Sequence, residues 1–302
     1  MTTLPDPAAH IAPFTPGASP APTVAVHLYQ IAYSPESLAG IPDGWLILDN
    51  QDNARPDWFE YWPIRCHLLE QTLDEQAFYG FFSPKFCSKT SLDHGQVQQF
   101  VRQHAAQADV LLFSPQPDMG AFFLNVFEQG EAFDPGLIDA YDQFLHHSGR
   151  PVPLRQLVMD ARQVVFSNYF VARPAFWREW LGLNEALFAL CEGPADGPDA
   201  ALRARLVQPT SYPGPGGAAQ RKVFLQERAA SLLLATQTQW RSQAHNPYGF
   251  GWSMSRFRQH PTEAVISDAL KMAWREHRFP QYLQAYLTVR ERFRQGATTG
   301  AA

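Results

Sequence analysis

The sequence has few cysteines, no excess of basic residues and no long hydrophobic run. Its three cysteines, at positions 66, 87 and 191, are odd in number and never spaced as CxxC. This argues against a disulfide framework and a thiolate zinc site. A formal charge of -5 with mixed signs gives no broad basic surface for nucleic acid phosphates. Because no stretch approaches the roughly 20 apolar residues that cross a bilayer, we expect a cytoplasmic protein with at most peripheral membrane contact.

The familiar nucleotide and hydrolase motifs are also missing. There is no GxGxxG, no Walker A loop, no HExxH and no GxSxG elbow. Dinucleotide oxidoreductases, P-loop NTPases, zincins and serine hydrolases therefore lose their usual support. The ten histidines lack the spacing of metal ligands, so no residue is assigned as a metal ligand on their account.

What is present indicates a folded α/β protein. Hydrophobic residues make up 45% of the 302 residues, which excludes extensive disorder. Residues 1–23 are rich in Pro, Ala and Thr and lack the features of a signal peptide. Three units are expected: a flexible leader at 1–23, the main domain at 24–240 and a helical C-terminal annex at 241–302.

Strand-like and helix-like segments alternate along the main domain, which predicts a mostly parallel sheet flanked by helices. The strands are expected at residues 24–33, 44–48, 76–82, 109–113 and 164–171. The helices are expected from Pro35 after a Ser34 cap, after residue 57 to about 71 with a kink or restart at Pro63, and at 92–106, 135–147, 174–191 and 222–240. Residues 192–217 are expected to be an irregular excursion, and a final helical stretch is expected at 262–294.

Polar residues that follow predicted strands are the first candidates for a ligand site, because ligands bind beyond the carboxyl ends of parallel strands. Tyr33 follows the first strand, and Lys85 follows the third. Lys85 could neutralise a diphosphate leaving group, although a solvated loop lysine is equally ordinary. After the second strand, Asp49, Asn50 and Asp52 could bind a ribose, a base or a divalent cation, or could simply form an Asx-rich turn.

Two further sets of residues are candidates. Glu227 and Arg228 lie in a strongly apolar helical segment, where Glu227 could serve as a general base or the two could form a structural pair. Most of the aromatic residues are expected in the core. Tyr248 and Trp252, in a Gly/aromatic loop, are candidate platforms for an acceptor sugar.

The order of several motifs resembles a bacterial glycosyltransferase-like family of capsule and O-antigen clusters, with the nucleotide-sugar-binding GT-A fold, a Rossmann-like sheet. The similarity spans roughly residues 24–235. The motifs are the polar run 49–53, the aromatic run 58–62, Tyr-Gly-Phe-Phe at 79–82, Ser-Asn-Tyr-Phe-Val at 167–171 leading to Phe176-Trp177, and Phe-Leu-Gln-Glu-Arg at 224–228.

The resemblance implies transfer of a sugar from a nucleotide-sugar donor to a surface-polysaccharide or glycolipid acceptor, which includes lipid-linked glycans. It places Glu227 on the helix that carries the base of inverting enzymes and Asn168 near the acceptor. The Asp-x-Asp metal motif of many GT-A enzymes is replaced by Ser-Pro-Lys at 83–85, so dependence on Mn²⁺ or Mg²⁺ stays open. The alternatives are a non-catalytic scaffold of the same fold and a carbohydrate-binding protein of polysaccharide biosynthesis.

Overall fold

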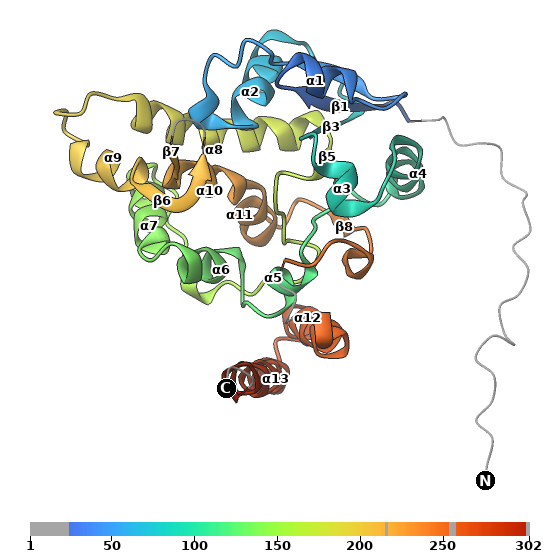
Figure 1. Cartoon of the computed structure of the whole chain (residues 1–302). Coiled ribbons are helices and arrows are strands. Elements are labelled where there is room, and N and C mark those ends of the chain that lie inside the picture. Colours follow the sequence, from blue (N-terminus) through green and yellow to red (C-terminus); the bar gives the residue numbers. More distant parts are fainter. Residues whose placement is uncertain (1–23, 215–216, 254–257, 300–302) are drawn as a thin grey trace, which may run out of the picture.

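The computed structural model describes residues 24–214, 217–253 and 258–299 (Figure 1). The expected leader at 1–23 lies outside these ranges. None of the helices within them has the length and apolar character that crossing a bilayer requires. The helices are α1 (Pro35–Ala39), α2 (Tyr61–Glu70), α3 (Phe86–Thr90), α4 (His94–His104), α5 (Pro117–Ala121), α6 (Val126–Phe133), α7 (Leu137–His147), α8 (Pro174–Glu192), α9 (Ala200–Leu206), α10 (Arg221–Glu227), α11 (Ala229–Thr236), α12 (Pro261–His277) and α13 (Pro280–Thr299).

A six-stranded, mostly parallel sheet organises the chain, which confirms the α/β class. Its strand order is β2 (Leu46–Asp49), β1 (Val26–Ala32), β3 (Phe78–Phe82), β5 (Phe170–Ala172), β4 (Val110–Leu112) and β8 (Ser242–Ala244). β1 pairs in parallel with β2 and β3, and β4 pairs in parallel with β8. β5 alone runs antiparallel to its neighbours, β3 and β4. A separate hairpin is formed by β6 (Pro209–Gly214) and β7 (Gly217–Gln220).

The core has two parts because β3 is buried on both faces. Phe78 and Phe82 pack on one face with residues of α3 and α4, including Val97. Tyr79 and Phe81 point to the other face, into the larger cluster with residues of α2 and α8. There the indole of Trp177 donates a hydrogen bond of 2.9 Å to the Tyr79 carbonyl. Continuous apolar sequence in this strand therefore reflects helices on both sides of the sheet.

Gly80 lets β3 approach β5 closely. A Cβ atom built on it would lie 2.7 Å from a methyl group of Val171, its partner across the ladder, and 2.9 Å from the Phe82 ring. We expect Gly80→Ala to lower the free energy of unfolding by about 1–3 kcal/mol, because overpacking forces neighbours apart. Urea unfolding measures this. Gly182→Ala is the matched control, since that exposed helical position has open space. This substitution should raise the free energy of unfolding by up to about 1 kcal/mol. Equal effects of the two substitutions would contradict the packing argument.

Several expected elements differ from those observed. The strand expected at 164–171 is reduced to β5 at 170–172, because Ser167 and Asn168 have φ of 59° and 54°, which ends extended backbone. The helix expected at 222–240 divides at Arg228 into α10 and α11. The helix expected after residue 57, with a kink or restart at Pro63, is a 3-10 turn at Pro56–Trp58 and then α2 from Tyr61. Pro63 therefore lies in the first turn of α2, where its missing N–H costs nothing. The excursion at 192–217 contains α9 and β6.

The C-terminal helices are fixed to the main body. The boundary expected at residue 240 lies just before β8, which belongs to the sheet, so the purely helical part starts at α12. α12 packs on α5 and on α13 (Figure 1). The buried ammonium of Lys271 on α12 donates to the Gly120 carbonyl at 2.5 Å and to that of Phe123 at 3.1 Å. Burial lowers the pKa of Lys271 to about 8, so it stays protonated near neutral pH.

Candidate functional site

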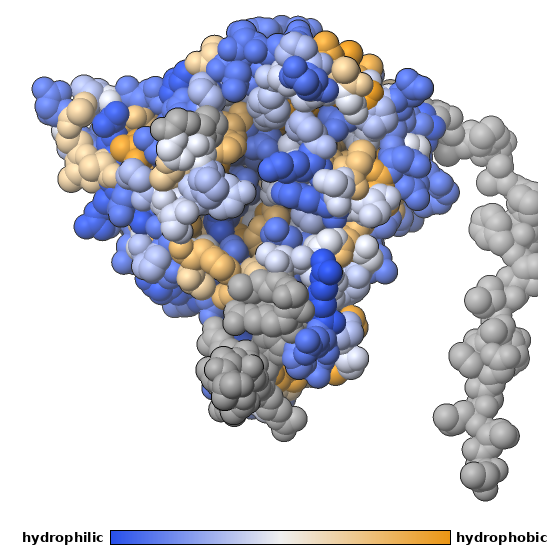
Figure 2. All heavy atoms as spheres, in the orientation of Figure 1, coloured by the Kyte–Doolittle hydropathy of each residue, from blue (hydrophilic) through white to orange (hydrophobic). Residues whose placement is uncertain are grey.

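A cleft of about 600 Å³ opens beyond the carboxyl ends of β1 and β3 and the amino end of β5. Because β5 runs antiparallel, the loop before it reaches the same edge of the sheet. The opposite wall comes from α6, α10 and the β6–β7 hairpin. Figure 2, in the orientation of Figure 1, shows a hollow near the centre of this face with hydrophilic and hydrophobic residues side by side around it. This volume suits a ligand of drug or nucleotide size.

Two glutamates line the cleft and influence each other. Burial raises the pKa of Glu227 to about 7, and the charge of Glu60 adds to this increase. Arg228 and Lys89 act in the opposite direction. Burial also raises the pKa of Glu60, which Lys89 and Lys85 oppose. A carboxyl group that titrates near neutrality is suited to take up a proton from a substrate and release it again.

Two lysines reach the cleft from the turn after β3. Lys85 is exposed, and Lys89 follows it by one helical turn. The ammonium of Lys89 donates to the Ser167 hydroxyl at 2.9 Å and lies 5.5 Å from the centre of the Tyr169 ring. The Tyr169 hydroxyl is 2.7 Å from that of Ser83. These contacts hold Lys89 in place at the cleft, where Lys85 is the more exposed of the two lysines.

Unusual backbone conformations cluster at this cleft. Asn53, Phe59, Gln116 and Ser167 all have positive φ, and all four line it. For Phe59, with φ 48° and ψ -133°, this conformation costs on the order of 1–3 kcal/mol. Such strain persists only where surrounding contacts hold it, and it is typical of ligand sites. Phe59 thereby turns the chain so that Glu60, directly after it and at the N-cap of α2, lies at the cleft.

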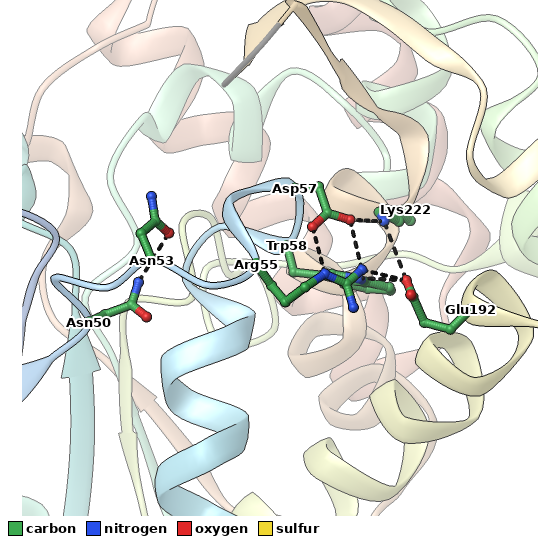
Figure 3. A network of polar contacts seen from close by, with 7 residues as sticks. All are labelled: Asn50, Asn53, Arg55, Asp57, Trp58, Glu192 and Lys222. Carbon is green, nitrogen blue, oxygen red and sulfur yellow. Dashed lines mark hydrogen bonds and ion pairs between the residues drawn. The ribbon is translucent and has the colours of Figure 1, made fainter.

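A network of charges holds this turn against α8 and α10 (Figure 3). Arg55 pairs with Asp57 through two nitrogens at 2.9 and 3.0 Å and with Glu192 at 2.7 Å. The indole of Trp58 donates to the same carboxylate at 3.0 Å. Lys222, whose side chain is 3% exposed, bonds to Asp57 at 2.5 Å. Because Lys222 belongs to α10, the network joins the segment that precedes Glu60 to the helix that carries Glu227.

Arg228 supports the wall of the cleft. Its guanidinium donates to the carbonyls of Val126 and Phe224 at 2.9 and 2.7 Å and to the side chain of Gln129 at 2.6 Å. It packs so closely on Gly130 that a Cβ atom there would lie 2.7 Å from a guanidinium nitrogen. Arg228 therefore joins α6 to the junction of α10 and α11, and its charge favours the ionised form of Glu227.

The structure brings together some of the residues expected from the sequence. Tyr33, Lys85, Glu227 and Arg228 all line the cleft. The Tyr33 hydroxyl is buried and has no hydrogen-bond partner among the described residues, so it is available to a ligand. Burial raises its pKa, which keeps it a proton donor.

The polar run after β2 lies beside the cleft, with only Asn53 among its lining residues. The carboxylate of Asp49 accepts the backbone N–H of Gln51 at 3.0 Å, so it forms the Asx turn that was the structural alternative. Asn50 is buried and donates to the Asn53 side chain at 3.3 Å (Figure 3). Asp52 is exposed.

The residues expected to bind an acceptor are likewise not part of the cleft lining. Asn168 is 1% exposed, beside the lining residue Ser167, and its amide has no hydrogen-bond partner within the described ranges. Tyr248 faces a different, much smaller pocket near Asp268. Trp252 packs against the larger core cluster.

The cleft residues that sequence reasoning missed include Glu60, Lys89, Phe133 and Tyr212. Glu60 lies inside the aromatic run 58–62, which indicated a helix core. Lys89 could have been found, since it follows Lys85 at i+4 and so shares a helix face with it. Phe133 and Tyr212 are apolar residues whose position on a cleft wall depends on tertiary packing.

The described part of the chain contains no group of three or more His, Cys, Asp or Glu side chains that could hold a metal ion. The cleft lining has three carboxylates, Glu60, Asp134 and Glu227, and three cations, Lys85, Lys89 and Arg228. The Asp134 carboxylate is already paired with Arg221 at 2.6 and 2.8 Å, so this set fits an anionic ligand better than a resident divalent cation. Comparison of the chain with protein-family models, with curated proteins and with solved structures found no match.

Proposed function

We propose that the protein is a glycosyltransferase of GT-A-like architecture that uses Glu227 as its general base and acts without a metal ion. The observation that carries this proposal is a half-buried glutamate with a pKa of about 7 in the same cleft as Lys85 and Lys89. Together they offer a proton acceptor and a positive field at the ligand-binding edge of an α/β sheet. The motif order that resembles glycosyltransferases supports the same assignment.

In the proposed reaction the Glu227 carboxylate takes the proton from an acceptor hydroxyl. The hydroxyl oxygen forms a bond to the anomeric carbon of the donor sugar while the bond from that carbon to the diphosphate oxygen breaks. The electron pair of the broken bond leaves with the nucleoside diphosphate, whose added charge Lys85 and Lys89 stabilise. Attack opposite the leaving group inverts the anomeric centre.

Thermal unfolding with a panel of nucleoside diphosphates and nucleotide sugars tests the donor site. A ligand at about 100 times its dissociation constant adds about 2.7 kcal/mol to the free energy of unfolding, which corresponds to roughly 5 °C in Tm. We expect a selective shift that is the same with manganese and with chelator. Lys85→Ala should reduce it, whereas Arg178→Ala, a surface cation paired with Glu75, should not.

A shift that requires manganese would contradict the metal-independent mechanism. The absence of a shift with every ligand would contradict the nucleotide site and favour a non-catalytic scaffold. A shift that Lys85→Ala leaves unchanged would remove Lys85 from donor binding.

A further inference from the structure

The cleft has a mostly apolar end, where the carboxylate of Asp134, also a lining residue, is paired with Arg221 at 2.6 and 2.8 Å. Phe133 is the last residue of α6 and Leu137 the first residue of α7. Both line the cleft together with Tyr212 of the β6–β7 hairpin. Phe133 is 50% exposed and Tyr212 54% exposed. Large apolar side chains left in solvent inside a concave site indicate binding of an apolar group.

α10 connects this apolar end to the general base. Val223, Phe224 and Glu227 all line the cleft and lie within one turn of each other on the helix. The rings of Phe224 and Tyr212 are nearly perpendicular, with 5.7 Å between ring centres. A ligand with a hydroxyl at Glu227 can therefore place its neighbouring atoms against Phe224 and Tyr212.

We propose that this apolar end binds a hydrocarbon group of the acceptor, attached close to the hydroxyl that reacts. The inference rests on the proposed function, because it assigns the donor to the two lysines and the acceptor to the apolar end. A sugar ring stacks on one aromatic face, whereas a hydrocarbon group contacts Phe133, Leu137 and Tyr212 together and removes them from water at roughly 25 cal/mol per Å² of apolar surface.

Binding of alkyl β-D-glucosides of increasing chain length tests this inference. Methyl, butyl, hexyl and octyl glucosides are titrated below their critical micelle concentrations, with ligand-observed NMR as the readout. Complete burial strengthens binding by up to about fourfold per methylene, so partial burial should make octyl glucoside bind about tenfold or more tightly than butyl glucoside. Phe133→Ala and Tyr212→Ala should each reduce this ratio to about threefold or less.

Ile47→Ala is the matched control, because Ile47 is 54% exposed on β2, outside the cleft, and should leave the ratio unchanged. Equal binding of all chain lengths, or no binding of any, would overturn the inference, as would a dependence on chain length that both cleft variants retain. A dependence lost in both variants, in a protein that no nucleotide stabilises, would uphold the apolar site and refute the transferase. Nucleotide binding without any dependence on chain length would refute the apolar site alone.

Discussion

Replacing Glu227 by glutamine is expected to lower the rate of transfer by about 10²–10⁴-fold, the usual contribution of a general base. Glutamine keeps the shape of the side chain but cannot take up a proton at neutral pH, so donor binding should stay within about threefold of the wild type. Initial rates and donor titrations measure the two quantities. Glu75→Gln, on an exposed glutamate, is the control and should keep full activity.

The pH dependence of the rate provides an independent check on the same residue. Since the pKa of Glu227 is about 7, kcat of the wild type should fall tenfold for each pH unit below 7. Glu60 raises that pKa, so Glu60→Gln should move the acidic limb of the profile to lower pH. An unchanged limb in Glu60→Gln, or near-normal turnover of Glu227→Gln, would remove Glu227 as the base.

Loss of activity in Glu227→Gln can be separated from unfolding. The folded protein holds the Glu227 proton more tightly than an ordinary carboxyl with pKa 4.5 does. Its ionisation therefore lowers the free energy of unfolding as pH rises from about 4.5 to 7. Above pH 7 the glutamine variant, which lacks this charge, should be more stable than the wild type by on the order of 2 kcal/mol.

Arg228→Lys is expected to lower the free energy of unfolding by about 2–4 kcal/mol. Lysine cannot replace the three nitrogens that bond to Val126, Phe224 and Gln129, and each buried acceptor left without a donor costs about 1–3 kcal/mol. Urea unfolding measures the loss, and Arg178→Lys at an exposed ion pair is the control. A loss below about 1 kcal/mol would show that Arg228 does not support the wall of the cleft.

The parts of the fold that follow from local pattern could be predicted from the sequence. β1, β2, β3 and β4 lie where runs of apolar residues predicted strands, and Ser34 caps α1 as expected, with its side chain accepting the Ser37 N–H. β8 could not be predicted, because Ser-Gln-Ala at 242–244 has no apolar pattern and forms a strand only by pairing with β4. The antiparallel direction of β5 could not be predicted either, because it depends on the loop before β5 and on pairing with β3 and β4.

Some residues of the candidate site could likewise be located from the sequence, and others could not. Tyr33 and Lys85 could be located because parallel strands end at one edge of the sheet. Asp49 and Asp52 also follow a strand, yet β2 is an edge strand, and the turn after it leads only Asn53 to the cleft. The contribution of Glu60 could not be predicted, since it depends on the positive φ of Phe59 and on contacts between segments more than one hundred residues apart in sequence.

The most direct test of the account is release of nucleoside diphosphate from nucleotide sugars at pH 8, with chelator present and water as a slow acceptor. We expect release from at least one donor by the wild-type protein and a rate lower by about 10²-fold or more with Glu227→Gln. Release that the substitution leaves unchanged would contradict the role of Glu227, and no release from any donor would contradict the proposed glycosyltransferase.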